Sequence, residues 1–218
     1  MNEKSEQFEI ATKQLFSGWA PRYDSPLFRL YFERLYRRIL ETLNQHGRDY
    51  VSPGATVLDI ACGTGEILFR LAKQHPKTNF VGIDLTTAMV EAAREKTKAL
   101  LNVEITEGNA EHLSFSNEAF DAVLCSEAFH HFPHPEQALQ EMHRVAKTRS
   151  LLMVVDPGFP SPFITKIVER ISRTFEVNKH IYNQHELRQL LEQQGFSVRS
   201  MSHYFFNNFF VCTKIRRR

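Results

Sequence analysis

An apolar strand, a glycine-containing turn and a helix follow one another in residues 56–72, which read TVLDIACGTGEILFRLA. Gly63 and Gly65 let the chain turn sharply and leave space for a ligand to approach the main chain closely. The helix that follows offers unpaired backbone amides and the positive end of its dipole to an anionic group. The segment therefore predicts a nucleotide-like ligand: a dinucleotide, a nucleoside triphosphate or a nucleoside without phosphates.

Strand and helix patterns alternate over residues 56–157, with five apolar segments of strand length. This alternation predicts an open parallel α/β sheet with helices on both faces. Ligands of such sheets bind beyond the carboxyl ends of the strands. We expect a single ligand-binding opening lined by the five loops that follow the strands. The residues at these strand ends are residues 59–65, Asp84, Asn109, Glu127 and Asp156.

The regular alternation ends after the fifth strand. Residues 159–183 are expected to be helical in their middle, and residues 184–196 form a helix closed by Gly195. Two β-rich runs then flank Asn207 and Asn208, a pair typical of a hairpin turn. Before the alternation, residues 26–44 have the periodicity of an amphipathic helix. Thr86 is expected to cap the helix that follows it.

Three features narrow the choice of ligand. A dinucleotide site needs a small residue at the position of Leu68, where the helix packs under the pyrophosphate. A phosphate-binding loop needs a lysine followed by serine or threonine after its last glycine, and the chain has neither there. Asp84 ends the second strand about 20 residues beyond the glycines, where a carboxylate accepts both hydroxyls of a ribose. A nucleoside without phosphates fits best.

Four segments, VLDIACGTGEIL, VGIDLT with MVEAA, EGNAEHLSF and FDAVLCSEAFHHFPHPEQALQEMHRV, stand in a characteristic order. They resemble the motifs of the class I S-adenosylmethionine-dependent methyltransferases, in the small-molecule branch of the ubiquinone and menaquinone biosynthesis methyltransferases. The resemblance implies a Rossmann-like, mostly parallel sheet of seven strands whose final strand is antiparallel. It implies one methyltransferase domain over residues 1–218: an N-terminal helical lid (1–50), a cofactor-binding core (51–157), a substrate cap (158–185) and a last helix with hairpin (186–218).

The resemblance also implies roles for individual residues toward S-adenosyl-L-methionine. Asp84 is expected to hold the ribose hydroxyls, and Asn109 stands where the family usually has aspartate. An amide oxygen still accepts a hydrogen bond from the adenine amino group. The expected cofactor-binding residues are Tyr23, Asp59, Ala61, Gly63, Gly65, Asp84, Leu85, Met89, Asn109, Ala110 and Ser126.

Methyl transfer from a sulfonium needs alignment more than it needs acid or base catalysis. His130 and His131 are candidate bases because histidine titrates near neutrality, although loop histidines held by ordinary hydrogen bonds are the favoured interpretation. No metal site is expected, because adjacent residues rarely ligate one ion. Tyr23 and Trp19 lie in a segment that resembles the family's lid, where an aromatic ring can contact a sulfonium.

The formal net charge of the chain is +2, which gives no general attraction to nucleic acid. The three cysteines, the polar start and the lack of any apolar run near 20 residues favour a cytoplasmic protein. Arginines in residues 26–44, the phenylalanines of residues 159–175 and the KIRRR tail raise peripheral membrane contact as an alternative to a solvated surface. The oligomeric state is left open.

The leading hypothesis is methyl transfer to a small aromatic or lipophilic acceptor. A non-catalytic S-adenosylmethionine-binding protein of the same fold is the first alternative, because the chemistry needs so few dedicated side chains. A nucleic-acid methyltransferase would place an Asn/Asp-Pro-Pro-aromatic turn where this chain has SEAFHHFP, and a protein arginine methyltransferase would need paired glutamates where only Glu127 is present. An NAD-dependent oxidoreductase is disfavoured by Leu68 and the terminal hairpin.

Overall fold

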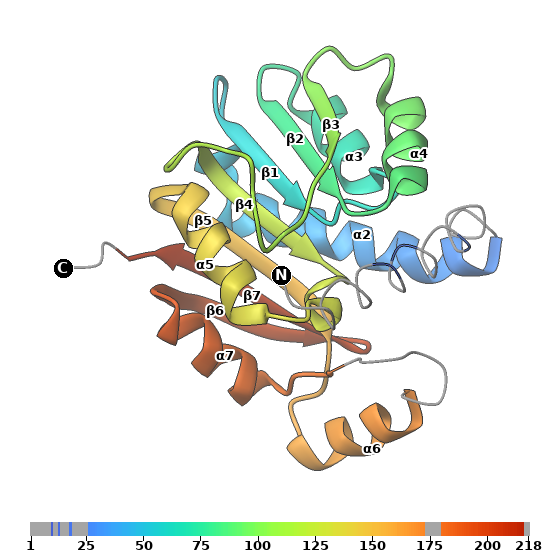
Figure 1. Ribbon diagram of the computed structural model, residues 1–218, viewed down its shortest axis with the longest axis vertical. Helices are drawn as coiled ribbons and strands as arrows, with labels where there is room; N and C mark the ends of the chain where they lie inside the picture. The colour runs from blue at the N-terminus through green and yellow to red at the C-terminus, as the bar shows by residue number, and fades with distance from the viewer. Residues whose placement is uncertain (1–9, 11–12, 14–17, 19–25, 173–179, 216–218) are drawn as a thin grey trace. The chain divides into compact units, whose positions relative to one another are not determined.

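The computed structural model describes residues 26–172 and 180–215, together with Ile10, Lys13 and Gly18. Its chain forms two compact units, Met1–Ala110 and Glu111–Arg218. The seven strands follow the order β3-β2-β1-β4-β5-β7-β6 (Figure 1). The expected Rossmann-like sheet with an antiparallel final strand is thereby confirmed. The division of one domain into four functional parts stays a prediction.

The parts of the first unit whose bounds the structure describes are three parallel strands and the helices α2, α3 and α4. β1 (Thr56–Ile60) pairs with β2 (Asn79–Asp84), and β2 pairs with β3 (Val103–Glu107). The helices are α2 (Pro26–His46), α3 (Glu66–Gln74) and α4 (Thr87–Thr97), with a 3₁₀ turn, η1 (Arg48–Val51), before β1. α3 and α4 both contact β2 and β3. Each strand is short, and β1 and β2 are mostly buried, as expected of strands covered by helices.

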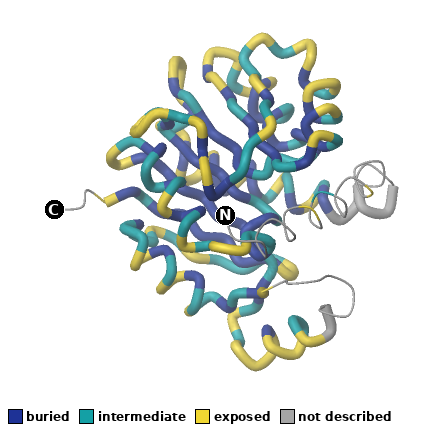
Figure 2. The backbone as a smooth tube through the Cα atoms, viewed as in Figure 1, coloured by how far each residue is buried: buried dark blue, intermediate teal, exposed yellow. Residues whose placement is uncertain are grey.

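The amphipathic character predicted for α2 is present in its described side chains. Leu35, Ile39 and Leu43 are almost fully buried, whereas Arg34 and Arg37 are exposed. Apolar residues at spacings of four bury one face of a helix and leave the charged face to solvent (Figure 2). Arg34 and Arg37 therefore belong to the solvated side of this helix.

The second unit contains the remaining strands. β4 (Phe120–Ser126) pairs in parallel with β5 (Ala146–Pro157), and β7 (Asn207–Lys214) pairs antiparallel with both β5 and β6 (Phe196–Tyr204). The helices are η2 (Phe129–His131), α5 (Pro135–Val145), α6 (Pro162–Ser172) and α7 (Gln184–Gln193). β5 and β7 are buried over most of their length, so they form the centre of this unit's core (Figure 2).

The turn of the terminal hairpin lies two residues earlier than predicted. Asn207 and Asn208 are the first residues of β7, opposite Pro157 and Asp156 of β5. The turn is instead made at Phe205, whose φ is 55°, and Phe206. Asn208 is fully buried; its side chain hydrogen-bonds to His203 (3.0 Å) and donates to the carbonyl of Tyr182 (3.5 Å). Tertiary hydrogen bonds thus outweighed the turn preference of asparagine.

Thr86 stands at the N-cap of α4 as predicted, but its side chain makes no capping hydrogen bond. Its backbone N–H donates instead to Asp84 Oδ1 at 2.9 Å. In the described part of the chain, no helix is long and apolar enough to cross a membrane.

Candidate active site

Asp84 ends β2 and braces the glycine turn that follows β1. Its Oδ2 accepts a hydrogen bond from the Gly63 N–H at 2.9 Å, and its Oδ1 accepts from the Thr86 N–H at 2.9 Å. The side chain is buried, and burial raises its pKa despite these two backbone hydrogen bonds. A carboxylate has about four lone-pair positions. The Thr86 side chain also hydrogen-bonds to Asp84, so one position is left for a ligand hydroxyl.

Asp59 lies on β1, beside Asp84, and is almost completely buried. Both of its carboxylate oxygens lack a hydrogen-bond partner among the described residues. Burial, and then the charge of Asp84, raise the pKa of Asp59 to about 8. Burying an ionised carboxyl group costs free energy unless a cation or a hydrogen-bond donor contacts it. It therefore fits the ammonium of an amino-acid moiety, such as the methionine part of S-adenosylmethionine.

The turn between β1 and α3 passes through the left-handed region three times. Ala61, Gly63 and Gly65 have φ values of 55°, 54° and 74°. A Cβ atom on Gly65 would lie 3.0 Å from the Cβ of Ala93 on α4. Glycine at this position therefore allows the left-handed backbone conformation and leaves room for α4 to pack closely. As the N-cap of α3, Gly65 offers no side chain to the first amides of the helix, which suits an anionic ligand.

Leu68, which argued against a dinucleotide, is fully buried against β2. A Cβ atom on Gly82 of β2 would lie 2.5 Å from the Leu68 side chain, 2.7 Å from that of Ile105 and 2.9 Å from Cys62 Sγ. The missing side chain of Gly82 thus provides the space that Leu68 fills. Sequence reasoning did not single out Gly82, because its role depends on contacts with residues far from it in the chain.

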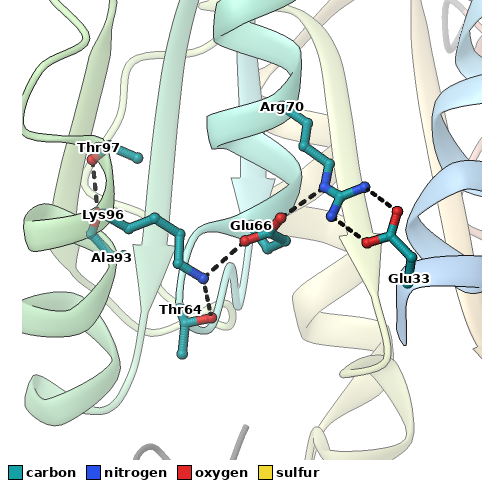
Figure 3. Close-up of polar contacts among 7 residues, drawn as sticks. All are labelled: Glu33, Thr64, Glu66, Arg70, Ala93, Lys96 and Thr97. Carbon is teal, nitrogen blue, oxygen red and sulfur yellow. Dashed lines mark hydrogen bonds and ion pairs between the residues drawn. The ribbon is translucent and has the colours of Figure 1, made fainter. Parts of the chain in front are cut away.

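Charged side chains behind the turn tie α2, α3 and α4 together (Figure 3). Arg70 donates to both oxygens of Glu33 (3.0 and 2.6 Å) and to Glu66 (2.7 Å), which also accepts from Lys96 at 2.9 Å. Lys96 donates in addition to the Thr64 hydroxyl at 3.2 Å. Burial raises the pKa of Glu66, but hydrogen bonds from Lys96 and Arg70 bring it below its ordinary value. Contacts from α2 and α4 thus hold the first turns of α3 in place.

The remaining predicted cofactor residues of the first unit follow β2 and β3. Leu85 is half-buried directly after Asp84, and Met89 is buried on the first turns of α4. Asn109 and Ala110 come after β3, where the N–H of Gly108 donates to the Asp84 carbonyl at 2.9 Å. Loops that follow neighbouring parallel strands emerge at the same sheet edge. These residues therefore belong to the same strand ends as Asp59 and Asp84.

In the second unit, His130 lies directly after β4 and forms a buried pair with Asp156 of β5. Its Nδ1 is 2.9 Å from Asp156 Oδ1, with 3% of the histidine side chain and none of the aspartate side chain exposed. An ionised carboxylate only accepts, so in that state of the pair the Nδ1–H of His130 would donate to Asp156. The His131 ring lies 3.9 Å from the His130 ring, centre to centre. Ser126, the last residue of β4, is half-buried.

Aromatic rings surround this histidine segment. Phe129 is fully buried, and its ring lies 5.7 Å from Phe132 and 5.4 Å from Tyr182. Burial, followed by the nearby charges of Glu136 and Asp156, raises the pKa of Tyr182 above its ordinary value. Tyr182 is therefore a neutral donor at physiological pH. The segment therefore combines a buried histidine with packed aromatic rings, of which Phe132 and Tyr182 are half-buried.

The third histidine of the HHFPHP segment has a structural role. The backbone N–H and the Nδ1 of His134 both lie 2.8 Å from the Glu111 carboxylate, at the start of α5. Among the described residues, no three or more His, Cys, Asp or Glu side chains are placed to hold a metal ion. Tyr23 and Trp19 lie outside the described residues.

Sequence reasoning placed Asp156 at a strand end but did not include it in the site, and it did not find Tyr182. The signal for Asp156 was its position after a fully apolar strand, which is where α/β proteins place ligand-binding residues. No local signal connected it with His130, which precedes it by 26 residues. Tyr182 follows a segment whose sequence pattern is irregular.

A family model described as a methyltransferase domain matches residues 51–195, more than half of the chain. The demethylmenaquinone methyltransferase of Deinococcus radiodurans is 34% identical over 157 residues, which cover 70% of this chain and 61% of that protein. The demethylmenaquinone methyltransferase of Lactiplantibacillus plantarum is 28% identical over 208 residues, or 84% of this chain and 86% of that protein.

A solved structure shows the same fold. Magnesium protoporphyrin IX methyltransferase of Synechocystis PCC 6803, with bound SAH, has a TM-score of 0.73 at 17% identity, covering 95% of this chain and 99% of that one. The strand order, the glycine turn with its two strand-end carboxylates and the matched family model agree with one another. The chain therefore belongs to the methyltransferase domain family and is an S-adenosylmethionine-dependent methyltransferase.

Proposed function

We propose that this methyltransferase acts on a small lipophilic aromatic acceptor of the demethylmenaquinone type. One observation supports S-adenosylmethionine as the methyl donor: the buried Asp59 carboxyl group has no hydrogen-bond partner among the described residues. It lies near Asp84, which accepts two backbone hydrogen bonds. The aromatic surroundings of His130 support the acceptor class, and so do the relatives named as demethylmenaquinone methyltransferases. Cytoplasmic location and the absence of a nucleic-acid partner belong to the same proposal.

The residues of the first unit bind the donor. Asp84 accepts from a ribose hydroxyl, and Asp59 accepts from the methionine ammonium, while the amides at the start of α3 meet the methionine carboxylate. Leu85 and Met89 flank the adenine, and the remaining contacts in this unit come from Ala61, Gly63, Gly65, Asn109, Ala110 and Tyr23. Ser126 of the second unit is proposed for the same ligand. When bound, S-adenosylmethionine supplies an electrophilic methyl group on a sulfonium. The chain contributes alignment and exclusion of water.

The residues of the second unit bind the acceptor and move its proton. Replacing hydrogen by methyl on a ring carbon or hydroxyl releases one proton, which needs an acceptor. His130 takes that proton at Nε2, because Asp156 holds its Nδ1–H and stabilises the imidazolium that results. His131 is the alternative base, and its ring contact with His130 also orients that ring. A general base raises the rate by a factor of roughly 10²–10⁴ where the methyl acceptor must lose a proton.

Mass spectrometry of the product tests this proposal. The purified chain is incubated with S-adenosylmethionine that carries a deuterated methyl group and with a water-soluble, short-chain demethylmenaquinone in its reduced form. We expect a product that is heavier by one deuterated methyl group. No labelled product from any aromatic acceptor, together with tight cofactor binding, would favour the non-catalytic alternative.

The base is tested separately with His130→Gln, and exposed His185 of α7 supplies the matched control His185→Gln. We expect kcat to fall by roughly 10²–10⁴ for His130→Gln, with an unchanged dissociation constant for S-adenosylmethionine. If kcat fell for His131→Gln and not for His130→Gln, His131 would be the base. Full activity of both single variants would leave positioning as the only contribution of this segment.

A further inference from the structure

The outward face of α6 is apolar, which is the reverse of an ordinary surface helix. Phe163, Ile164 and Ile167 are 73%, 46% and 45% exposed. Their spacing of three and four residues places them on one side of the helix. Figure 2 shows α6 exposed along much of its length. Isolated exposed apolar residues are common on proteins, but three on a single helix face mark an interaction surface.

Two polar residues of α6, Thr165 and Glu169, are held by hydrogen bonds to neighbouring residues of the chain. Thr165 is buried, and its hydroxyl lies within 3.3 Å of the carbonyl of Phe159 and 3.0 Å of that of Ser161. Glu169 accepts from His180 Nδ1 at 3.0 Å. These contacts fix the rotation of the helix about its axis. The apolar face is therefore held outward by hydrogen bonds on the opposite side.

Basic side chains border this apolar face. Lys166 and Arg170 are exposed, and they follow Phe163 and Ile167 by three residues each, so they lie next to them on the helix surface. The one acid of the helix, Glu169, is engaged with His180. An exposed apolar stripe with cations beside it complements the headgroups and acyl boundary of an anionic bilayer.

The tip of the terminal hairpin adds two aromatic residues. Phe205 and Phe206 are 55% and 56% exposed. The ring of Phe159 lies 6.1 Å from that of Phe206, and the Gly158 N–H donates to the Phe206 carbonyl at 2.8 Å. Since Phe159 also contacts Thr165 of α6, one residue joins the hairpin tip to the base of the helix.

We propose that α6 and the tip of the β6–β7 hairpin form a docking surface for an anionic lipid bilayer. Phe163, Ile164, Ile167, Phe205 and Phe206 enter the interface, and Lys166 and Arg170 contact the headgroups. The sequence suggested three segments for membrane contact, and this surface uses one of them, residues 159–175, through α6. Arg34 and Arg37 lie on the solvated side of α2, and Lys214, which begins the KIRRR tail, is buried with its ammonium donating to the Ala146 carbonyl at 2.7 Å. One part of this proposal rests on the proposed function, namely that the bilayer supplies the lipophilic methyl acceptor.

Vesicle flotation tests the surface with neither cofactor nor acceptor present, so that its outcome is independent of turnover. The full chain is floated with vesicles of phosphatidylcholine alone and with vesicles that also contain phosphatidylglycerol, at low and at high salt. We expect binding to the anionic vesicles that weakens with salt. F163Q/I167Q should weaken binding by about tenfold or more, since it removes apolar area from the interface.

K166Q/R170Q should weaken binding to anionic vesicles by about 30-fold at low salt, from about 1 kcal/mol for each basic residue. Leu101→Gln is the matched control, because Leu101 is a fully exposed apolar residue of the first unit, between α4 and β3; it should bind as the parent does. Three results would overturn the proposal: no binding of the parent at low salt, equal binding of F163Q/I167Q, or an equal loss in Leu101→Gln.

Sedimentation velocity of the same proteins addresses a second copy as the occupant of this face. We expect F163Q/I167Q to sediment as the parent does. A parent dimer that becomes monomeric in F163Q/I167Q, without vesicle binding by the parent, would reassign the face to self-association and overturn the proposal.

Discussion

Asp59 makes the stability of the protein without cofactor depend on pH. Its pKa of about 8 lies far above the ordinary value of 3.8, so between these values the folded state holds a proton that the unfolded state has lost. The free energy of unfolding must then fall as pH rises from about 4 to about 8. Asp59→Asn removes this contribution, while Asp84, whose pKa burial also raises, keeps one of the same sign. We expect the melting temperature of Asp59→Asn to exceed that of the parent above pH 8.

The measurement is thermal unfolding across that pH range without cofactor. Glu104→Gln, which changes an exposed acid of β3, is the control and should keep the parent's profile. A parent whose stability rises steadily through the same range, or an Asp59→Asn profile that follows the parent's, would show that Asp59 is ionised in the folded state.

Gly82 is predicted to be intolerant of even one added methyl group. A Cβ atom there would meet the side chains of Leu68, Ile105 and Cys62 at 2.5–2.9 Å. Overpacking of this kind typically costs 1–3 kcal/mol, so Gly82→Ala should lower the free energy of unfolding in urea by about that amount. Gly108→Ala is the control, because its Cβ would meet only Ile83 at ordinary contact distances of 3.5–3.6 Å. Equal stability of the two variants would contradict the packing described for β2.

At the scale of elements, Arg70 connects three helices of the first unit through Glu33, Glu66 and their neighbours (Figure 3). Its side chain is about one quarter exposed, so water screens these contacts only in part. Arg70→Met should lower the free energy of unfolding by about 1–2 kcal/mol, because it removes the cation that Glu33 and Glu66 share, while Lys96 still contacts Glu66. Arg188→Met, which removes an exposed i,i+4 pair with Glu192, should change it by less than about 0.5 kcal/mol.

Urea denaturation at neutral pH and at low and high salt measures both variants. The Arg70→Met loss should shrink at high salt, as expected for a partly screened ion-pair network. An Arg70→Met protein as stable as Arg188→Met would mean that the network contributes nothing beyond surface ion pairs.

The terminal hairpin shows where local sequence patterns stop being sufficient. Its two strands follow from β-branched and aromatic residues, and both were predicted. Its turn was placed wrongly because the asparagine preference for turns is weak beside tertiary hydrogen bonds, here those of buried Asn208 to His203 and Tyr182. The predicted helix within residues 159–183 was present as α6, but its inverted amphipathic face emerges only from the burial of Thr165.

At the scale of the whole molecule, the order of motifs was enough to predict the fold class, the family and the cofactor. The glycine turn and Asp84 encode their geometry locally, since a strand end, a turn and a helix start are consecutive in sequence. Pairs such as His130 with Asp156, or Gly82 with Leu68, depend on which strands and helices meet. Periodicity predicts that a residue is buried, but it does not identify the neighbour against which it packs.

The central claim is that the glycine turn and its carboxylates hold S-adenosylmethionine. Isothermal titration of the parent and of Asp84→Ala with S-adenosylmethionine and with NAD tests it most directly, with Glu104→Gln as the control and thermal unfolding to verify folding. We predict that the parent and the control bind S-adenosylmethionine and not NAD, and that Asp84→Ala binds it about 10- to 150-fold more weakly, which corresponds to about 1.5–3 kcal/mol for hydrogen bonds to a charged group. Unchanged affinity in folded Asp84→Ala, or binding of NAD alone by the parent, would contradict the account.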